Sequence, residues 1–489
     1  MASIQIPWPK TALPGRHPGE SQGTLVNAYA VQVGEEIRIR RTAGLRRYLT
    51  PDPTSSKKIP RGMLDLGTAL LHAWDGVLMR RNEDGSNINA VGALPGSEPV
   101  TMARNLRQDK PDVVVVTQQT GALYYDIATN TLGPYPEDAT DGGESVAAVE
   151  SVEYYSGYFM FTRRGGTMIA SDLQEADIIG GSTAVAEYVA DDLYRTKNVG
   201  SALAVMGSKS TEFWVDVGSS PFPLQRQTSI DVGLLSPWAV AGGSNEWENG
   251  LLWVAGDWTV RMLNGFQAQP VSTDDVVNDI RNASMQADDL YAQVYVFNAQ
   301  AIWSLSCSQW TWEYNVSTGA WHKRESYQKA NWRGRHGCRF LTEWLAQDWH
   351  GTGCLFSISP NVFDEDGERL RWFVESAPLK EFPANVRVPS IDIDMTVGIG
   401  QEGKPSPFQT DPVVMVSWSH NGGANWSNPL ARSMGKEGRY ATKITVNNLG
   451  RSTHQGTMIR LEVVDPVWVQ LTGAISTRTK PSRARGVNQ

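Results

Sequence analysis

The sequence has few cysteines and no long apolar run. Its 489 residues include 3 cysteines, too few and odd in number for a disulfide framework, which is typical of a protein that folds in a reducing cytoplasm. No run of about 18 apolar residues could form a membrane-spanning helix. The first residues also lack the basic and apolar segments of an export signal. We therefore expect a protein with neither an export signal nor a membrane anchor.

An excess of positive charge is also missing. The chain has 44 lysines and arginines against 52 aspartates and glutamates, a net charge of -8. Such a chain has no overall attraction for the backbone of nucleic acid or for an anionic membrane. Any contact with DNA would have to come from a local patch.

Glycine, proline and aromatic residues are abundant, with 46 Gly, 26 Pro, 18 Trp and 15 Tyr. The apolar runs are short, rich in β-branched or aromatic residues, and closed by Gly, Asp, Asn or Thr. Runs of this kind are typical of β-strands joined by turns. The sequence therefore predicts an all-β protein.

One pattern, two apolar strands around a polar turn, recurs through the middle of the chain. Its second strands start at Val77, Ala122, Met168, Glu212, Thr259, Ile302 and Leu355. This spacing of roughly 45 residues is the length of one four-stranded propeller blade. A single hairpin cannot bury its apolar face, whereas blades arranged in a ring cover one another. The pattern predicts a β-propeller of six or seven blades, with one large antiparallel sandwich as the alternative.

We divide the chain into four segments. Residues 1–62 are predicted to form an N-terminal docking segment with the first strands, and residues 63–380 the propeller. Residues 381–478 contain four or more strand-like runs and predict an additional C-terminal β-sandwich-like domain. Residues 479–489 are polar and basic and predict a flexible tail. Within the propeller, the acidic start and apolar face of residues 273–282 predict one short helix lying on the ring.

Two patterns resemble ligand sites, and we interpret both as structural. Residues 398–403 match the dinucleotide-binding fingerprint, but the prolines that follow cannot open the helix that would hold the pyrophosphate. Four residues offer soft metal ligands: His336, Cys338, His350 and Cys354. Their first gap is shorter than usual zinc spacings, and a buried free cysteine is the commoner state. We predict no metal, no cofactor and no catalytic residue.

A turn near the C-terminus is similar to the Asp-box hairpin, S-x-D-x-G-x-x-W. It comprises Ser419, Asn421, Gly423 and Trp426, with Asn421 in the Asp position. The Ser and Asn side chains would bond the turn backbone, Gly would adopt a positive φ, and Trp would cover the hairpin. Asp boxes are familiar from sialidase propellers, which makes a glycan hydrolase or glycan-binding tail protein an alternative. Against hydrolysis, the box occurs once and no carboxylate pair stands out.

The densest basic stretch of this acidic chain lies near its start and contains Arg38, Arg40, Arg41, Arg46 and Arg47. If the isoleucines between the first arginines point inward on a strand, Arg38 and Arg40 share the opposite face. There they could bind phosphates or the carboxylates of a partner protein. The other interpretation is an ordinary solvated strand face.

Three stretches, each with its own motif, are informative when taken together. The first is Asn27-Ala28-Tyr29 followed by RTAGLR at 41–46, with Ala43 where proline is usual. The second, at 230–280, contains Gly-Leu and Ser-Pro pairs, and the third, at 417–466, contains the SHNGG turn and a GKEGRY run. Together they resemble the tail hub, or nozzle, proteins of short-tailed bacteriophages (podoviruses), also described as packaged-DNA stabilisation proteins.

The resemblance implies a β-propeller with added β domains and a structural role without catalytic residues. It implies a virion tail protein, present in the host cytoplasm during assembly, that forms a homohexameric ring below the portal and adaptor. Such a ring extends and helps to close the DNA channel and carries needle, tail fibre or tailspike proteins. A mainly negative wall would let packaged DNA slide without sequence-specific binding. An intracellular propeller that serves as an interaction scaffold is a further alternative.

Overall fold

The fold is that of a computed structural model of the chain. It describes residues 2–17, 19–49, 59–107, 110–136, 146–176, 182–186, 188–243, 247, 249–286, 289–400 and 407–478. The predicted basic tail at 479–489 lies outside the described residues.

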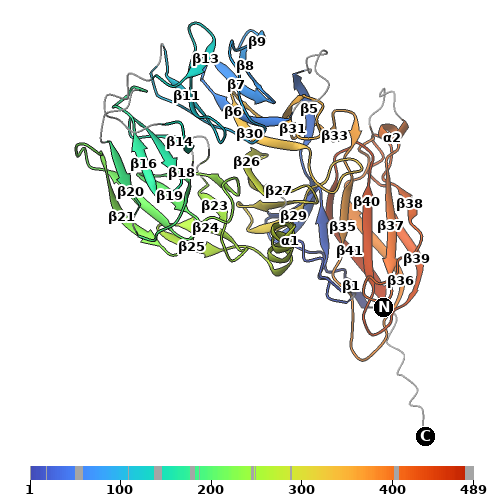
Figure 1. Cartoon of the computed structure of the whole chain (residues 1–489). Helices are drawn as coiled ribbons and strands as arrows, with labels where there is room; N and C mark the ends of the chain where they lie inside the picture. Colours follow the sequence, from blue (N-terminus) through green and yellow to red (C-terminus); the bar gives the residue numbers. More distant parts are fainter. Residues whose placement is uncertain are drawn as a thin grey trace.

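Seven four-stranded antiparallel sheets surround a common centre within the described part of the chain (Figure 1). Five consist of consecutive strands: β6 (Pro60–Asp65), β7 (Ala69–Trp74), β8 (Val77–Asn82) and β9 (Asn87–Asn89); β10 (Thr101–Arg104), β11 (Val113–Thr117), β12 (Gly121–Asp126) and β13 (Thr131–Pro134); β14 (Val149–Tyr155), β15 (Tyr158–Arg163), β16 (Thr167–Ala170) and β17 (Thr183–Val185); β18 (Leu193–Val199), β19 (Ala202–Gly207), β20 (Thr211–Asp216) and β21 (Leu224–Ile230); β22 (Val240–Gly242), β23 (Leu251–Val254), β24 (Val260–Asn264) and β25 (Gln267–Pro270). The sixth also consists of consecutive strands: β26 (Tyr291–Phe297), β27 (Gln300–Ser306), β28 (Thr311–Asn315) and β29 (Ala320–Lys323).

The seventh sheet is completed by a strand from the start of the chain. It contains β30 (Gly334–Phe340), β31 (Glu343–Asp348), β32 (Leu355–Ser359) and β5 (Gly44–Leu49). β5 runs antiparallel to β32, with Leu49 opposite Leu355, and a short hairpin, β33 (Asp364–Glu365) and β34 (Glu368–Arg369), follows beside β5. The innermost strands of the first and last sheets, β6 and β30, contact each other. The propeller is therefore a closed ring.

The valines of β11 explain why the sheets pack radially. Val113 and Val115 belong to a core shared with the first sheet, whereas Val114 and Val116 belong to a core shared with the third. All four are buried, because the alternating faces of the strand are covered by different neighbours. Each contributes on the order of 1.5–3 kcal/mol of burial energy. A continuous apolar run is what a strand buried on both faces requires.

The predicted propeller is confirmed, and its blade number, left open between six and seven, is seven. Most of the repeat positions fall on or beside the third strand of a blade. Ile302 instead lies on β27, the second strand of the sixth blade. The third strand of that blade, β28, begins only at Thr311, because α1 (Asp274–Met285) is inserted between the fifth and sixth blades. Val276, Ile280 and Ala283 of α1 are buried against the ring, as its predicted amphipathic pattern requires.

The predicted sandwich is also confirmed. One of its sheets contains β2 (Thr24–Val26), β35 (Trp372–Glu375), β40 (Met458–Val463), β37 (Val413–Ser419) and β38 (Leu430–Ser433). The other contains β3 (Ala28–Val33), β4 (Glu36–Arg41), β41 (Gln470–Arg478), β36 (Arg387–Met395) and β39 (Ile444–Arg451), with β1 (Ala2–Gln5) beside β41. A one-turn helix, α2 (Pro407–Thr410), precedes β37. Strands from the first 49 residues thus enter both sheets of the sandwich as well as the ring.

One sheet runs without a break from the ring into the sandwich. β2 pairs in parallel with β29 of the sixth blade, Val26 opposite Lys323, and antiparallel with β35 of the sandwich. The result is a nine-stranded sheet, β26-β27-β28-β29-β2-β35-β40-β37-β38. In Figure 1 the sandwich accordingly stands directly against the side of the ring. Backbone hydrogen bonds, in addition to side-chain packing, therefore hold the two parts together.

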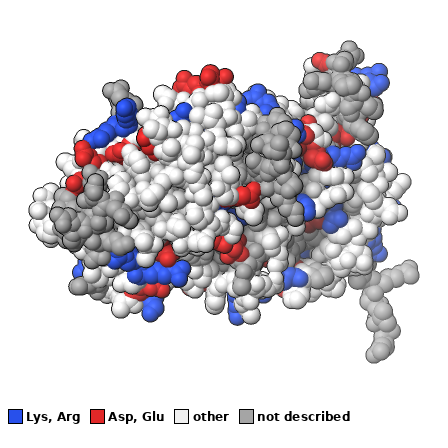
Figure 2. Space-filling model, turned by 45° about the horizontal axis from the view of Figure 1, so that its top comes forward, with Lys and Arg blue, Asp and Glu red and all other residues white. Residues whose placement is uncertain are grey.

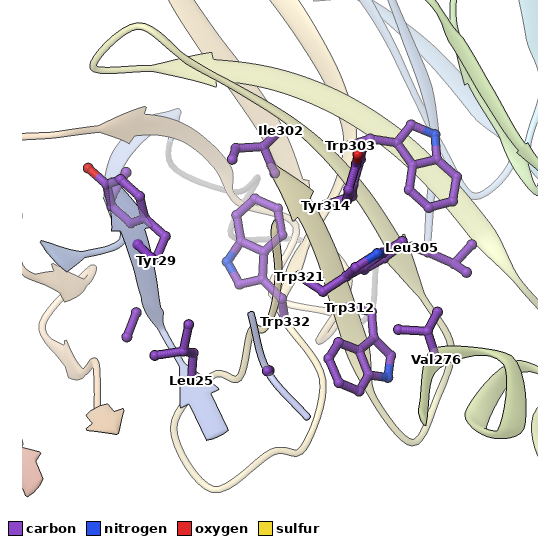
Figure 3. Close-up of a cluster of buried hydrophobic side chains, with 14 of the residues drawn as sticks. Leu25, Tyr29, Val276, Ile302, Trp303, Leu305, Trp312, Tyr314, Trp321 and Trp332 are labelled. Carbon is purple, nitrogen blue, oxygen red and sulfur yellow. The ribbon is translucent and has the colours of Figure 1, made fainter. Parts of the chain in front are cut away.

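Tryptophans fill the core beside this junction (Figure 3). Trp303 and Trp312 each lie edge-on to Trp321, with ring centroids 6.3 Å apart. The indole N–H of Trp321 donates to the Val271 carbonyl at 2.7 Å, and that of Trp312 donates to Asp279 of α1 at 2.9 Å. Because Trp312 and Trp321 bury their rings and still satisfy their N–H groups, they pack α1 and the sixth blade into one core.

Candidate functional site

The five arginines predicted to bind a partner lie on two strands that belong to different parts of the molecule. β4 is a strand of the sandwich, whereas β5 completes the seventh blade of the ring. Only residues 42 and 43 separate the two strands. The basic stretch therefore forms no single surface and divides into three groups with different environments.

Arg41 is buried and has to be removed from the predicted docking face. On β4 the side chains of Ile39 and Arg41 both point inward, and each is 1% exposed. The Arg41 guanidinium donates four hydrogen bonds of 2.7–2.8 Å to backbone carbonyls, those of Leu370, Val463, Asp465 and Val467. Burial lowers the pKa of Arg41 to about 9, although nearby carboxylates act in the opposite direction. The twofold alternation of a strand already carried this signal, since Arg41 is two residues from an inward isoleucine.

Arg38 and Arg40 occupy the opposite face of β4, where the alternation predicts them. Arg38 pairs with Glu36 at 3.3 Å, and its side chain is 31% exposed. The Nε of Arg40 donates to Gln470 of β41 at 2.9 Å, and its guanidinium lies 6.0 Å from the centre of the Trp468 ring. Both guanidiniums are therefore held at the surface of the sandwich by weak contacts.

Arg46 and Arg47 are exposed on the ring and already have acidic partners. Arg46 donates to both carboxylate oxygens of Glu343 on β31, at 2.9 and 3.1 Å. Arg47 pairs with Asp366, in the hairpin beside β5. Their side chains are 57% and 47% exposed, so each pair contributes about 0–1 kcal/mol to stability. A partner could replace these internal carboxylates at little energetic expense.

Figure 2 is consistent with paired surface charges. On the face that it shows, basic and acidic side chains lie near one another around an extensive uncharged area. No field of a single sign covers this face. Docking through charge would therefore depend on specific side chains.

A buried polar network, missed by sequence reasoning, lies under the connection between β4 and β5. The Arg324 guanidinium donates to the Ala43 carbonyl at 2.6 Å, lies 3.9 Å from each of Glu313 and Glu365, and stacks 4.3 Å above the Trp332 ring. All four of these side chains are buried. Burial raises the pKa of Glu365, and Arg324 opposes this shift. Sequence spacing gives no signal for the network because its members come from distant segments.

Asn27 lies between β2 and β3 and hydrogen-bonds to residues next to both the ring and the sandwich. It adopts φ 49° between β2 and β3. Its amide donates to the carbonyls of Glu325 and Arg371 and accepts from the Glu325 N–H, at 2.9–3.0 Å. A groove of about 480 Å³ lies beside it and includes Tyr327 and Glu462. Asn27, the first residue of the Asn-Ala-Tyr pattern, therefore helps to join the ring to the sandwich.

The turn at residues 419–426 has the hydrogen bonds that its sequence suggests. The Ser419 hydroxyl accepts from the Gly423 N–H at 2.9 Å, and the Asn421 side chain accepts from the Asn425 N–H at 2.9 Å. Gly423 has φ 92°. Trp426, in contrast, is only half-buried, and the guanidinium of Arg460 stacks 3.8 Å from its ring centre. The Trp thus covers a surface arginine more than a hairpin core.

The residues considered for zinc are occupied otherwise. His336 is buried and bonds the Pro60 carbonyl at 3.1 Å, and His350 bonds Asn331 at 3.3 Å. In the described ranges no three His, Cys, Asp or Glu side chains are grouped to hold a metal ion. No described helix is long and apolar enough to cross a membrane.

A cavity of about 480 Å³ lies at the centre of the ring. Residues from the innermost strands of all seven blades line it, from Met63 on β6 to Cys338 on β30. A hollow of this volume is far too small for a DNA duplex, whose major groove alone is roughly 12 Å wide. A DNA duplex therefore cannot pass through the propeller of one subunit.

Comparisons with known proteins identify both parts of the chain. A family model described as bacteriophage P22 Gp10, beta-propeller, matches residues 73–355, and one described as bacteriophage P22 Gp10, beta-sandwich, matches residues 373–477. No curated protein matches.

Several solved structures are distantly similar. A chain of the Mitotic Checkpoint Complex has a TM-score of 0.44 at 13% identity, covering 68% of this chain and 98% of that one. The computationally designed protein Ika8 has a TM-score of 0.39 at 10% identity (73% and 100% covered). PorZ of Porphyromonas gingivalis, described as a surface component of the type-IX secretion system, has a TM-score of 0.38 at 9% identity (72% and 44% covered). Similarities this low say nothing about the function of the chain.

Proposed function

The chain belongs to the bacteriophage P22 Gp10 family, the tail hub or nozzle proteins of podoviruses, and on this premise we propose that it forms a ring, of six copies, that docks below the portal and adaptor. It is a structural protein of a phage tail that interacts with other virion components. The family points to a structural role and not to an enzymatic one. In our proposal the ring extends and helps to close the DNA channel, retains packaged DNA, and carries needle, fibre or tailspike proteins.

The nine-stranded sheet that joins ring and sandwich is the observation that supports this role best. A hub has to carry attached proteins without its own domains moving apart. Interfaces made only of side chains allow domains to move, whereas a shared backbone ladder resists that movement. The buried Arg324 adds a hydrogen bond from the ring to the connection between β4 and β5, and next to this junction the buried Arg41 holds β4 within the sandwich. Each subunit is therefore suited to act as one stiff body.

The small central cavity limits where DNA can pass. Because a duplex does not fit inside one propeller, the channel in our proposal runs between subunits. The net charge of -8 per chain would give its wall a mainly negative character, which favours sliding of DNA over binding. The host cytoplasm would be the place of assembly.

Docking is assigned, in this proposal, to the exposed arginines. Arg38 and Arg40 on β4 and Arg46 and Arg47 on β5 present forked donors suited to carboxylates of an adaptor. The division into a docking segment (1–62), a propeller (63–380), a sandwich (381–478) and a basic tail (479–489) stays in the proposal as a division of the sequence. In the fold, strands of residues 1–62 join both the sandwich and the ring, and β35 joins the sandwich.

Native mass spectrometry and electron microscopy of the purified chain, alone and with its portal–adaptor complex, test the proposal. We expect rings of six copies when the adaptor is present. A chain that remains monomeric at high concentration with the adaptor, and forms no ring in micrographs, would overturn it.

A further inference from the structure

The central cavity of the ring continues into a second one of about 150 Å³. Glu153, Arg195, Lys197 and Tyr291 line both. The two cavities are therefore parts of one lumen, and these four polar residues line the part that the two share. The lumen is enclosed by the propeller itself and lies apart from the arginines assigned to docking.

Two cations of β18 point into this lumen. Arg195 and Lys197 are two residues apart on one strand, so their side chains share a face. Lys197 has a partner, because its ammonium lies 3.4 Å from a carboxylate oxygen of Glu153. Arg195 forms no ion pair with any carboxylate in the described ranges, although Glu153 and Tyr291 are near enough to influence its charge.

The Arg195 guanidinium is held in place but not satisfied. It stacks over the Trp238 ring at 4.6 Å, which fixes its plane. Its Nε and Nη1 atoms are buried and have no hydrogen-bond partner among the described residues. A buried guanidinium with open donors is costly, because charged groups removed from bulk water need compensating hydrogen bonds and counter-charge. The lining residues supply little of that counter-charge: the Glu153 carboxylate, which acts on the charge of Arg195, is also paired with Lys197. Asp65, a second carboxylate of the lining, forms no ion pair with Arg195 in the described ranges.

We propose that the lumen of each propeller binds a small oxyanion, a phosphate or a small carboxylate, with Arg195 as its main ligand and Lys197 as a second positive charge. The planar fork of an arginine matches two oxygens of such an anion. The size of the lumen excludes a DNA strand with its bases and selects a free small anion. A bound anion would also stabilise the ring at its centre, where all seven blades meet.

Isothermal titration calorimetry of the full-length chain with sodium phosphate tests this inference, with sodium chloride at matched ionic strength as the blank and sodium citrate as the carboxylate probe. We expect about one phosphate per chain. Arg195→Gln should weaken binding by about tenfold or more. The matched control is Arg281→Gln, since Arg281 also stacks on a tryptophan, Trp258 at 5.3 Å, but on α1 outside the lumen. This control should bind as the wild type does.

A second variant and a direct measurement of the site distinguish a loss of the anion site from misfolding of the Arg195→Gln variant. Arg195→Lys keeps the charge but loses the fork, and should bind phosphate with intermediate affinity. Crystals soaked in selenate should show an anomalous peak beside residue 195 in the wild type. No measurable phosphate or citrate binding, equal affinity of wild type and Arg195→Gln, or a selenate peak only outside the lumen would each overturn the proposal. Citrate binding without phosphate binding would identify the anion as a carboxylate.

Discussion

Six blades of the ring are each built from consecutive strands, whereas the seventh is completed by a strand from the first 49 residues. β5 completes the seventh blade, and β2 extends the sixth into the sandwich. The consecutive blades need only local pairing, which is entropically cheap. The seventh blade, and the link between the sixth blade and the sandwich, need contacts between residues about 300 positions apart, such as Leu49 with Leu355 and Val26 with Lys323. Local blades thus provide the repeat, and the N-terminal strands close the ring and attach the sandwich.

This difference predicts that the closing region is the most sensitive to substitution. Arg41→Met should produce the largest loss, about 3–5 kcal/mol, because it leaves four buried carbonyls without their donor. The loss should appear as a lower denaturation midpoint in urea, followed by tryptophan fluorescence. The control is Arg46→Met, two residues into β5, whose exposed pair contributes about 0–1 kcal/mol. Equal midpoints for the two variants would contradict the assignment of Arg41 to the junction.

Gly44 tests ring closure itself. A Cβ added at Gly44 would lie 2.4 Å from the backbone oxygens of Val362 and Asp364. The backbone would have to shift, and we expect Gly44→Ala to destabilise the chain by about 2–3 kcal/mol. Limited proteolysis should then cut near β5 earlier than in the wild type. Gly133→Ala, in a strand of a consecutive blade with nothing within 4 Å, should change neither stability nor the cleavage pattern.

The turn at 419–426 offers a smaller effect. Because Trp426 is half-buried under Arg460, Trp426→Ala should cost about 1–2 kcal/mol, less than the roughly 3–5 kcal/mol of a core aromatic. A double-mutant cycle with Arg460→Ala measures the stacking directly. A coupling energy near zero would show that the contact contributes nothing to stability.

The same comparison explains what the sequence could predict. The repeat, the helix at α1 and the sandwich were predictable because each depends on local periodicity. The ring closure by β5 and the sheet junction at β2 were not predictable. Their partner strands are far away in the sequence, and the residues of a strand do not identify which distant strand it pairs with. The inward position of Arg41 was predictable from alternation, but five clustered arginines suggested one surface. Arg324 gave no signal, because Ala43, Glu313 and Glu365 meet only in the fold.

The last prediction concerns the outer face of β4, where we expect substitutions to slow docking without changing the stability of the subunit. Arg38→Glu with Arg40→Glu removes weak contacts at the surface, with Glu36, Gln470 and the Trp468 ring, so the subunit should stay folded within about 1 kcal/mol. Charges at the rim of an interface mainly set the encounter rate and its salt dependence. We therefore expect slower docking onto the portal–adaptor complex, and particles that lose DNA.

The matched control makes the same charge change on two strands of the other half of the same sheet. Arg387 and Arg451 are exposed and lie opposite each other on β36 and β39, and Arg387→Glu with Arg451→Glu should leave the docking rate unchanged. Stopped-flow light scattering at several salt concentrations measures both variants. If the β4 variant docks at the wild-type rate at physiological salt and yields stable particles, its arginines form only a solvated face. Docking would then rest on Arg46 and Arg47, whose carboxylate partners a portal–adaptor surface could exchange.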